Sequence, residues 1–182
     1  MTDPTAPNPS EPTPDFTGPS PLEAAQPSAE DEQRARIAAA IVALEQGGQR
    51  GANWFFWVGG LSLVNSAIIL SGGNTFFVIG LGVTLLADFV ANGFAQQKPD
   101  IAMVVKGVAF GFDVFVALVV ALFGWLSRKR IIPVFAIGMV LYLLDGLIFL
   151  LFQDWLSIAF HAFALFGMWK GIGAYRNLGR LE

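Results

Sequence analysis

Nine polar or ionisable side chains stand within stretches of the chain that are otherwise apolar. Carboxylates and a histidine at such positions can bind and release protons, because histidine titrates near neutral pH and a neighbouring carboxylate shifts it. Charge in an apolar medium is costly, so these side chains are expected to face the interior of a bundle and to pair with one another. This polar cluster consists of Asn65, Asp88, Asn92, Lys106, Asp113, Tyr142, Asp145, Ser157 and His161.

The spacing of these residues predicts particular pairs. Asp145 and His161 lie at nearly equal distances from the connection at 153–154, so they should meet if the flanking helices are antiparallel. Lys106 is expected to neutralise Asp88 or Asp113. Three acids with one lysine and one histidine leave an imbalance, which requires either a protonated carboxyl group or access of water. Two interpretations stay open: polar clasps that fix the helix register, or a proton path through a cavity.

Hydrolytic chemistry is a further option, because Asp154, Ser157 and His161 share one helical face at spacings i, i+3 and i+7. A hydrolytic triad requires the histidine between the serine and the acid, whereas here the serine lies between the other two. The single histidine excludes bis-histidine haem ligation, and the lack of cysteine excludes thiolate metal sites. The sequence therefore predicts no enzyme, no cofactor and no metal site.

Five apolar stretches must position the polar cluster, and the five tryptophans fall at their ends. Tryptophan gathers at the lipid–water boundary because its ring is apolar while its N–H needs a partner. Stretches of 18 to 27 residues reach roughly 27–40 Å, enough for a hydrocarbon core of about 30 Å. The sequence predicts an all-α transmembrane helix bundle in the cell (inner) membrane, with antiparallel neighbours. The predicted spans are 53–70, 75–94, 101–127, 131–152 and 155–172.

The segment before the spans has a different composition: eight of the ten prolines and eight of the fourteen acids precede residue 53. Residues 1–27 cannot bury enough apolar surface to fold, which predicts a disordered, proline-rich acidic tail. A capping pattern over 28–31, followed by apolar residues at helical spacing, predicts a short amphipathic helix at 28–46. It should end at Gly47-Gly48 and lie on the membrane or bundle, or in water. Residues 173–182 are predicted to form a C-terminal tail after the last span.

Five spans would place the two ends of the chain on opposite faces of the membrane. The face with the C-terminus collects more basic residues, so the positive-inside rule places it in the cytoplasm. Moving a fifty-residue tail across the membrane without a cleavable signal argues against this orientation. No basic surface of the kind that binds nucleic acid is present. The basic residues on the C-terminal face are Arg128, Lys129, Arg130, Lys170, Arg176 and Arg180.

Small residues provide a last signal, because Gly107-x-x-x-Gly111 and Gly167-x-x-x-Gly171 allow close helix approach. Packing within the bundle is the expected use, and a homodimer contact is the other. The first functional hypothesis is a non-enzymatic membrane component that acts in the lipid bilayer through contacts with a membrane-protein partner or a second copy. The alternative is a small proton-linked carrier or channel that uses Asp145 with His161, and Asp88 or Asp113.

One segment resembles known proteins. It runs from Tyr142-Leu-Leu-Asp145-Gly146 through Phe152-Gln-Asp154-Trp155 to His161, and it is similar to small, uncharacterised bacterial multi-pass membrane proteins. The resemblance is confined to the hairpin of the fourth and fifth spans. It implies an integral membrane protein and no particular activity.

Overall fold

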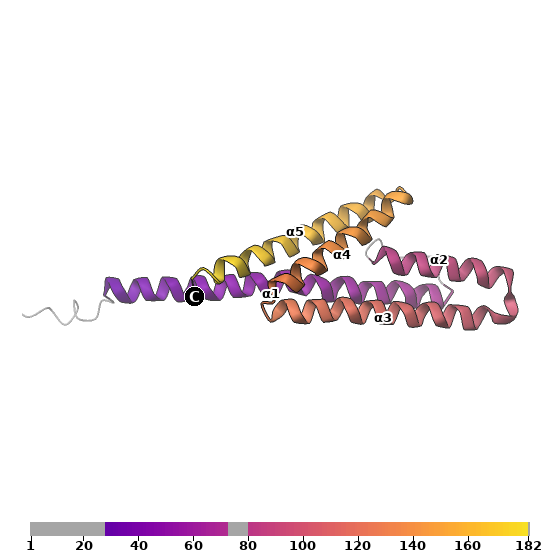
Figure 1. The fold of residues 1–182 in the computed structure, drawn as a ribbon, viewed down its shortest axis with the longest axis horizontal. Coiled ribbons are helices and arrows are strands. Elements are labelled where there is room, and N and C mark those ends of the chain that lie inside the picture. Colours follow the sequence, from indigo (N-terminus) through magenta and orange to yellow (C-terminus); the bar gives the residue numbers. More distant parts are fainter. Residues whose placement is uncertain (1–27, 73–79, 182) are drawn as a thin grey trace, which may run out of the picture. The chain divides into compact units, whose positions relative to one another are not determined.

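The computed structural model describes residues 28–72 and 80–181. The tail predicted over 1–27 lies outside them, as does the beginning of the span predicted at 75–94. The described residues form only helices and their connections, which confirms the all-α fold class (Figure 1). The helices are α1 (Ala29–Leu70), α2 (Gly82–Gln97), the short 3₁₀ helix η1 (Pro99–Ile101), α3 (Ala102–Arg128), α4 (Ile132–Leu151) and α5 (Trp155–Leu178).

The chain divides into two units, residues 1–39 and 40–182. The described part of the first unit is the exposed beginning of α1. Ser28 caps this helix, since its hydroxyl accepts a hydrogen bond from the Asp31 amide at 3.2 Å and donates one to the Asp31 carboxylate at 2.7 Å. The capping pattern read from the sequence is therefore confirmed. Two exposed ion pairs follow the cap, each between residues one turn apart: Arg34 with Glu30 and Arg36 with Glu32.

The expected break at Gly47-Gly48 is wrong, because α1 continues without interruption for 42 residues. These small residues allow another helix to approach rather than ending their own. A Cβ atom added to Gly48 would collide with the ring of Tyr175 on α5, and one added to Gly171 would lie 2.6 Å from the Cα of Gly51. The predicted amphipathic helix at 28–46 and the predicted span at 53–70 are consequently parts of one helix.

Within residues 40–182, α1 packs against α3, α4 and α5. Its contacts with α5 pair Gly48 with Tyr175 and Gly51 with Gly171, so the two helices are antiparallel. Phe55 of α1 lies at the centre of the core, with its ring centroid 5.7 Å from that of Phe135 on α4. The largest fully buried side chains also include Met168 and Leu178. Apolar packing between long helices therefore forms the framework that holds the polar residues.

The relation between α1 and α2 differs from the prediction. The hydroxyl oxygens of Ser62 and Thr84 are 2.7 Å apart, and one turn further along both helices Ser66 lies beside Asp88. Because both residue numbers increase together, α1 and α2 run parallel, and the antiparallel pair expected from a short connection is wrong. Helix α2 has sixteen residues, which is about 24 Å at 1.5 Å per residue. It starts beside the middle of the membrane-length part of α1.

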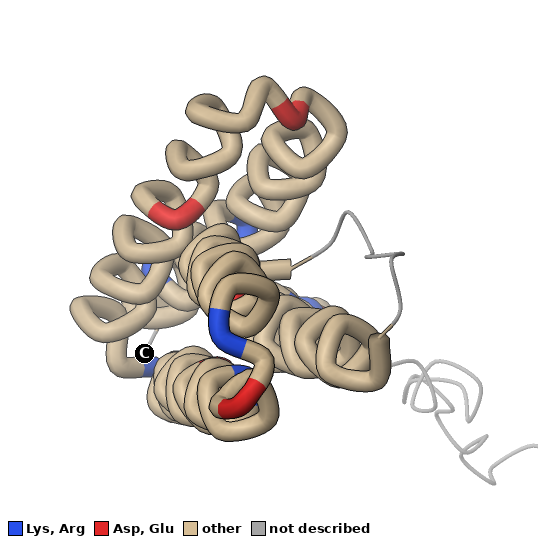
Figure 2. The backbone as a smooth tube through the Cα atoms, turned by 90° about the vertical axis from the view of Figure 1, so that its right-hand side faces the viewer, with Lys and Arg blue, Asp and Glu red and all other residues tan. Residues whose placement is uncertain are grey.

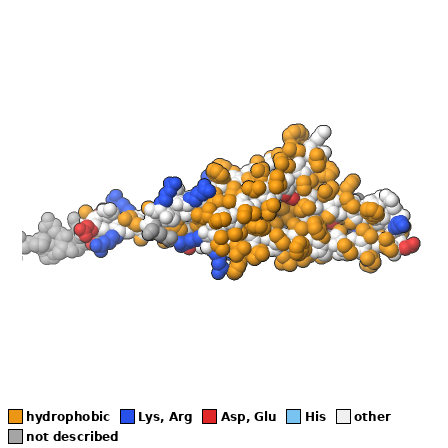
Figure 3. All heavy atoms as spheres, in the orientation of Figure 1, with side chains coloured by type: hydrophobic (Ala, Val, Ile, Leu, Met, Phe, Trp, Pro, Cys, Tyr) orange, Lys and Arg blue, Asp and Glu red, His pale blue; other side chains and the backbone are white. Residues whose placement is uncertain are grey.

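Among residues 28–72 and 80–181, four helical stretches are long and apolar enough to cross a membrane: α1, η1 with α3, α4 and α5. Charged residues are few along these helices (Figure 2). Large apolar side chains are exposed over the bundle surface, among them Met103, Val108, Phe115 and Leu151 (Figure 3). An exterior of this kind is consistent with lipid as the surrounding solvent.

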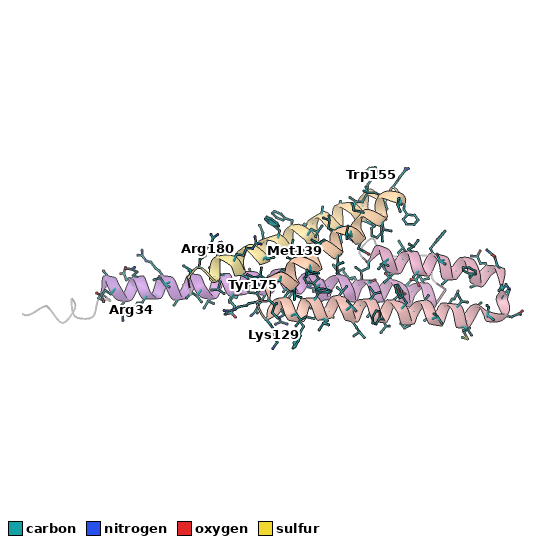
Figure 4. The ribbon with its side chains drawn as sticks, in the orientation of Figure 1. Arg34, Lys129, Met139, Trp155, Tyr175 and Arg180 are labelled. Atoms are coloured by element: carbon teal, nitrogen blue, oxygen red, sulfur yellow. The ribbon has the colours of Figure 1, made fainter. Side chains whose placement is uncertain are left out.

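Most basic residues of the bundle gather at one end, whereas Lys98 and Lys106 lie towards the other, at the end of α2 and the beginning of α3. Figure 4 shows Lys129 and Arg180 near the basic end and Trp155 near the other. Arg130, beside Lys129, forms an ion pair with Glu45 of α1 at 3.1 Å. The point where α1 enters the bundle and the C-terminal end of α5 therefore lie together. The expectation that they lie at opposite ends is wrong, since it rested on counting α2 as a complete span.

Candidate functional site

The beginning of α2 is buried inside the bundle, where its free amide groups need acceptors. An α-helix leaves its first four N–H groups without partners in the helix. Asp145 of α4 supplies two of these partners: the Gly82 amide donates to Oδ2 at 2.8 Å, and the Val83 amide donates to Oδ1 at 2.9 Å. A carboxylate is favourable here because a helix N-terminus carries partial positive charge. One side chain thus anchors a helix that starts in the interior.

Glycine at position 82 makes this contact sterically possible. A Cβ atom there would lie 2.9 Å from the backbone carbonyl oxygen of Asp145 and 3.0 Å from the Phe149 ring. Gly146 plays the same role on the other side of α4, where a Cβ atom would lie 2.9 Å from Cδ2 of His161. Helix α4 therefore carries Asp145 between two close contacts, one with α2 and one with α5.

His161 of α5 completes this arrangement. Its Nε2 lies 3.2 Å from Oδ2 of Asp145, and its Nδ1 lies 2.9 Å from the backbone carbonyl oxygen of Ser157. The imidazole stacks on Tyr142, with ring centroids 4.4 Å apart and an angle of 17° between the planes. Only 3% of His161 and 9% of Asp145 is exposed. The pair expected from the sequence is thus present and almost completely buried.

The hydrogen bonds determine how many protons this pair holds. A backbone carbonyl can only accept, so Nδ1 of His161 carries a hydrogen. Nε2 and Oδ2 of Asp145 can then form a hydrogen bond only if a second proton lies between them. The pair is either an imidazolium with a carboxylate or a neutral histidine with a carboxylic acid. Both forms have zero net charge, and they differ only in the position of one proton.

A second pair of acids lies between α1, α2 and α3. The carboxyl group of Asp113 on α3 lies beside Ser66 of α1 and Asp88 of α2. Asp113 is 0% exposed, and neither of its oxygens makes a hydrogen bond of good geometry with the described residues. Two carboxyl groups in contact in an apolar interior repel each other when both are ionised, so this site favours holding a proton as well.

The remaining members of the polar cluster have separate roles. Lys106 is half-buried and forms no ion pair within the described part of the chain, so the expected neutralisation of Asp88 or Asp113 does not occur. Asn65 is buried on α1 next to Gly80, where a Cβ atom would lie 2.7 Å from its Nδ2. Asn92 lies on α2 one turn beyond Asp88, half-buried.

Ser157 belongs to the cap of α5. Its hydroxyl donates to Oδ2 of Asp154 at 2.6 Å, and its amide donates to Oδ1 at 3.1 Å. The hydrogen bond from the Ser157 hydroxyl is the main reason that the pKa of Asp154 lies below its ordinary value. His161 contacts the Ser157 carbonyl and not its hydroxyl. The geometry of Asp154, Ser157 and His161 is therefore unlike that of a Ser–His–Asp triad.

A cavity of about 190 Å³ lies between α1, α3 and α4, at the beginning of α2. Its walls are apolar except for Tyr142 and Asp145. The Tyr142 hydroxyl is buried and has no hydrogen-bond partner among the described residues. A smaller cavity of about 10 Å³ adjoins Ser66, Thr84 and Asp88, which is about the space that one water molecule occupies. The Asp145–His161 pair and Asp88 thus each have a cavity beside them.

No protein-family model, no curated protein and no solved structure matches this chain. The function therefore has to be argued from the site itself. The contact of Asp145 with His161 could be predicted from the sequence, but the backbone amides of Gly82 and Val83 as further partners of Asp145 could not. The available signal was the pair Gly80 and Gly82 in a stretch predicted as continuous helix, because glycine lowers helix propensity.

Proposed function

We propose that the protein is an integral membrane protein of the cell (inner) membrane with four complete spans and a half-helix, α2, that enters the bundle from one side. The long apolar helices and the apolar exterior support this arrangement. Both ends of the chain then emerge at the basic end of the bundle, which the positive-inside rule places in the cytoplasm. The acidic tail needs no transport across the membrane in this orientation.

The proposed molecular function is that of a small proton-linked carrier or channel. The observation that supports it is Asp145, which binds the half-helix α2 and His161 through the same carboxylate. Discontinuous helices in membrane proteins are tolerated where they line a cavity or bind substrates and coupling ions. Here the helix terminus, the cavity and the contact with His161 meet at one residue, Asp145.

Proton movement would change the strength of this contact. A carboxylate binds the two α2 amides and the helix N-terminus more strongly than a carboxylic acid does, because hydrogen bonds to charged groups are stronger. Transfer of the shared proton from His161 to Asp145 would weaken the hold on α2. The position of α2 is in this way coupled to the position of one proton beside the cavity.

The test is proton flux in liposomes, measured with a trapped pH-sensitive dye after an imposed pH step. Flux should be present with the wild-type protein and lost in Asp145→Asn and in His161→Ala. Asp100→Asn, which changes an exposed carboxylate in η1, is the matched control and should retain flux. Each variant is first checked for monodispersity in detergent. Flux that persists in both site variants would remove the transport proposal.

A second function, as a non-enzymatic component that acts through protein contacts, is favoured by one face of α3. Cβ atoms added to Gly107 and Gly111 would meet nothing within 4 Å, whereas Cβ atoms added to Gly167 and Gly171 would collide with residues of α1. The first small-residue motif is thus not used within the described bundle. Val108 lies on the same face of α3 as Gly107 and Gly111. A cysteine introduced at Val108 should crosslink two copies of the protein, or the protein and a partner, in membranes. If nothing is crosslinked or co-purified, this candidate function loses its support.

A further inference from the structure

Two surface grooves flank Trp57 on α1 near the basic end of the bundle. The larger, about 600 Å³, reaches from Arg128 and Asn53 along α1 to Val64. The other, about 430 Å³, contains Arg50 and extends to Phe160 of α5. Both include Asn53, Trp57 and Leu61, so Trp57 forms the wall between them. We call them together the Trp57 grooves.

The chemistry of the grooves changes along α1. At one end are Arg50 and Arg128, which are exposed and form no ion pair within the described part of the chain. Neither groove has an acidic residue in its lining. Further along, the lining is apolar, with Gly60 as an open part of the floor where a Cβ atom would meet nothing within 4 Å.

The length of this gradient fits one kind of molecule. From Asn53 to Val64 the helix advances by about 16 Å at 1.5 Å per residue. A ligand that follows it needs a negative group at the arginine end and a long apolar part. Arginine suits phosphate in particular, because its planar guanidinium donates two parallel hydrogen bonds.

We propose that the Trp57 grooves bind an anionic glycerophospholipid, with its phosphate beside Arg50 and Arg128 and an acyl chain over Gly60 and Leu61. Two observations support this assignment: Arg50 and Arg128 form no ion pair with another described residue, and the groove beyond them is lined by apolar residues. Basic pockets beside membrane helices on the cytoplasmic side bind anionic headgroups. The site is separate from the Asp145–His161 pair and does not depend on proton transport.

The test counts lipids that stay bound to the protein. The protein is reconstituted in vesicles of equimolar phosphatidylglycerol and phosphatidylcholine and extracted in a mild detergent. Native mass spectrometry then gives the number of each retained lipid. The wild type should retain phosphatidylglycerol in preference to phosphatidylcholine. Removing one arginine should weaken retention about fivefold, and Arg50→Gln with Arg128→Gln should remove the preference.

Two further variants separate this site from general attraction to the surface. Arg176→Gln with Arg180→Gln removes the same charge at the same end of the bundle and should leave retention unchanged. Gly60→Leu fills the groove floor without changing charge, and it should lower retention because the acyl chain loses its place. Soluble glycerol 3-phosphate at millimolar concentration should not compete.

Three results would overturn the proposal. Equal loss in both double variants would mean that net charge and not the grooves attracts the lipid. Competition by glycerol 3-phosphate would indicate a site for free phosphate. A second copy of the protein bound in place of lipid, with the same sensitivity to Gly60→Leu, would make the grooves a protein contact. Thermal unfolding in uncharged detergent shows whether the double variant Arg50→Gln with Arg128→Gln keeps its fold. If the double variant does not fold, the two single variants are compared instead.

Discussion

Replacing Asp145 by asparagine tests whether this carboxylate holds the buried N-terminus of α2. In the wild type each carboxylate oxygen accepts one backbone hydrogen bond, from the Gly82 amide at 2.8 Å and from the Val83 amide at 2.9 Å. An asparagine side chain has one oxygen and one NH₂ group, so it can accept only one of the two hydrogen bonds. The other amide then faces a second donor at a site where only 9% of Asp145 is exposed.

The magnitude follows from what is lost. A hydrogen bond to a charged group contributes about 1.5–3 kcal/mol in water-soluble proteins, and a carboxylate at a helix N-terminus adds about 0.3–1 kcal/mol. Polar contacts between membrane helices contribute less, about 0.6 kcal/mol on average and about 1.7 at most, because the unfolded chain in the membrane finds other partners. We expect Asp145→Asn to lower the free energy of unfolding by about 1–2 kcal/mol, the membrane scale with one buried donor left unpaired.

Asp145→Ala should lower it by about twice as much, since both amides and His161 lose their partner. For a chain of this length, 1 kcal/mol corresponds to a shift of about 2–4 °C in Tm. Thermal unfolding in detergent should therefore show a loss of roughly 2–8 °C for asparagine and a larger loss for alanine, with Asp100→Asn unchanged. If both Asp145 variants unfold within 1 °C of the wild type, Asp145 does not anchor α2.

Three further predictions concern packing, the cap of α5 and the topology. Gly171→Leu should prevent close approach of α1 and α5 and abolish a monodisperse product in detergent, whereas Gly173→Leu, where a Cβ atom meets nothing within 4 Å, should purify normally. Asp154→Ala should lower stability by about 0.5–2 kcal/mol at pH 7. Because the pKa of Asp154 lies below its ordinary value of 3.8 in the folded protein, this difference should be constant above pH 3.8 and should shrink as the pH falls from there through the lower pKa of the folded state, which pH-dependent unfolding measures. In the cysteine-free wild type, Arg180→Cys should react with a membrane-impermeant maleimide only after the membrane is opened, and Asp100→Cys should react in intact spheroplasts; labelling of both from the same side would exclude the proposed topology.

The sequence was sufficient for the elements whose signals are local. Long apolar periodicity identifies the helices, and a carboxylate or hydroxyl before a helix identifies the caps at Ser28 and Asp154. The contact between Asp145 and His161 could also be predicted, since a short connection fixes the register of α4 against α5. Each of these inferences uses residues that are close in the sequence.

The errors have a common physical origin, because each concerns a residue whose role depends on a distant helix. Gly48 and Gly51 look like a helix end when only their propensity is considered, but they are contact surfaces for Tyr175 and Gly171. Gly82 looks like part of a span, although its amide is the donor to Asp145. Tertiary packing decides between these roles, and nothing in the local sequence does.

The half-helix changes the expected topology of the whole chain. With α2 as a complete span, the number of crossings is odd, and the acidic tail must cross the membrane. With α2 beginning inside the bundle and running parallel to α1, the crossings become even, and the part of α1 around Gly48 lies beside the C-terminal end of α5, as the contact of Gly48 with Tyr175 requires. The basic residues after α3 and in the last turns of α5 then join those on α1 at one end. A single difference, the place where α2 begins, thus brings the charge distribution and the helix contacts into agreement, which supports the proposed orientation.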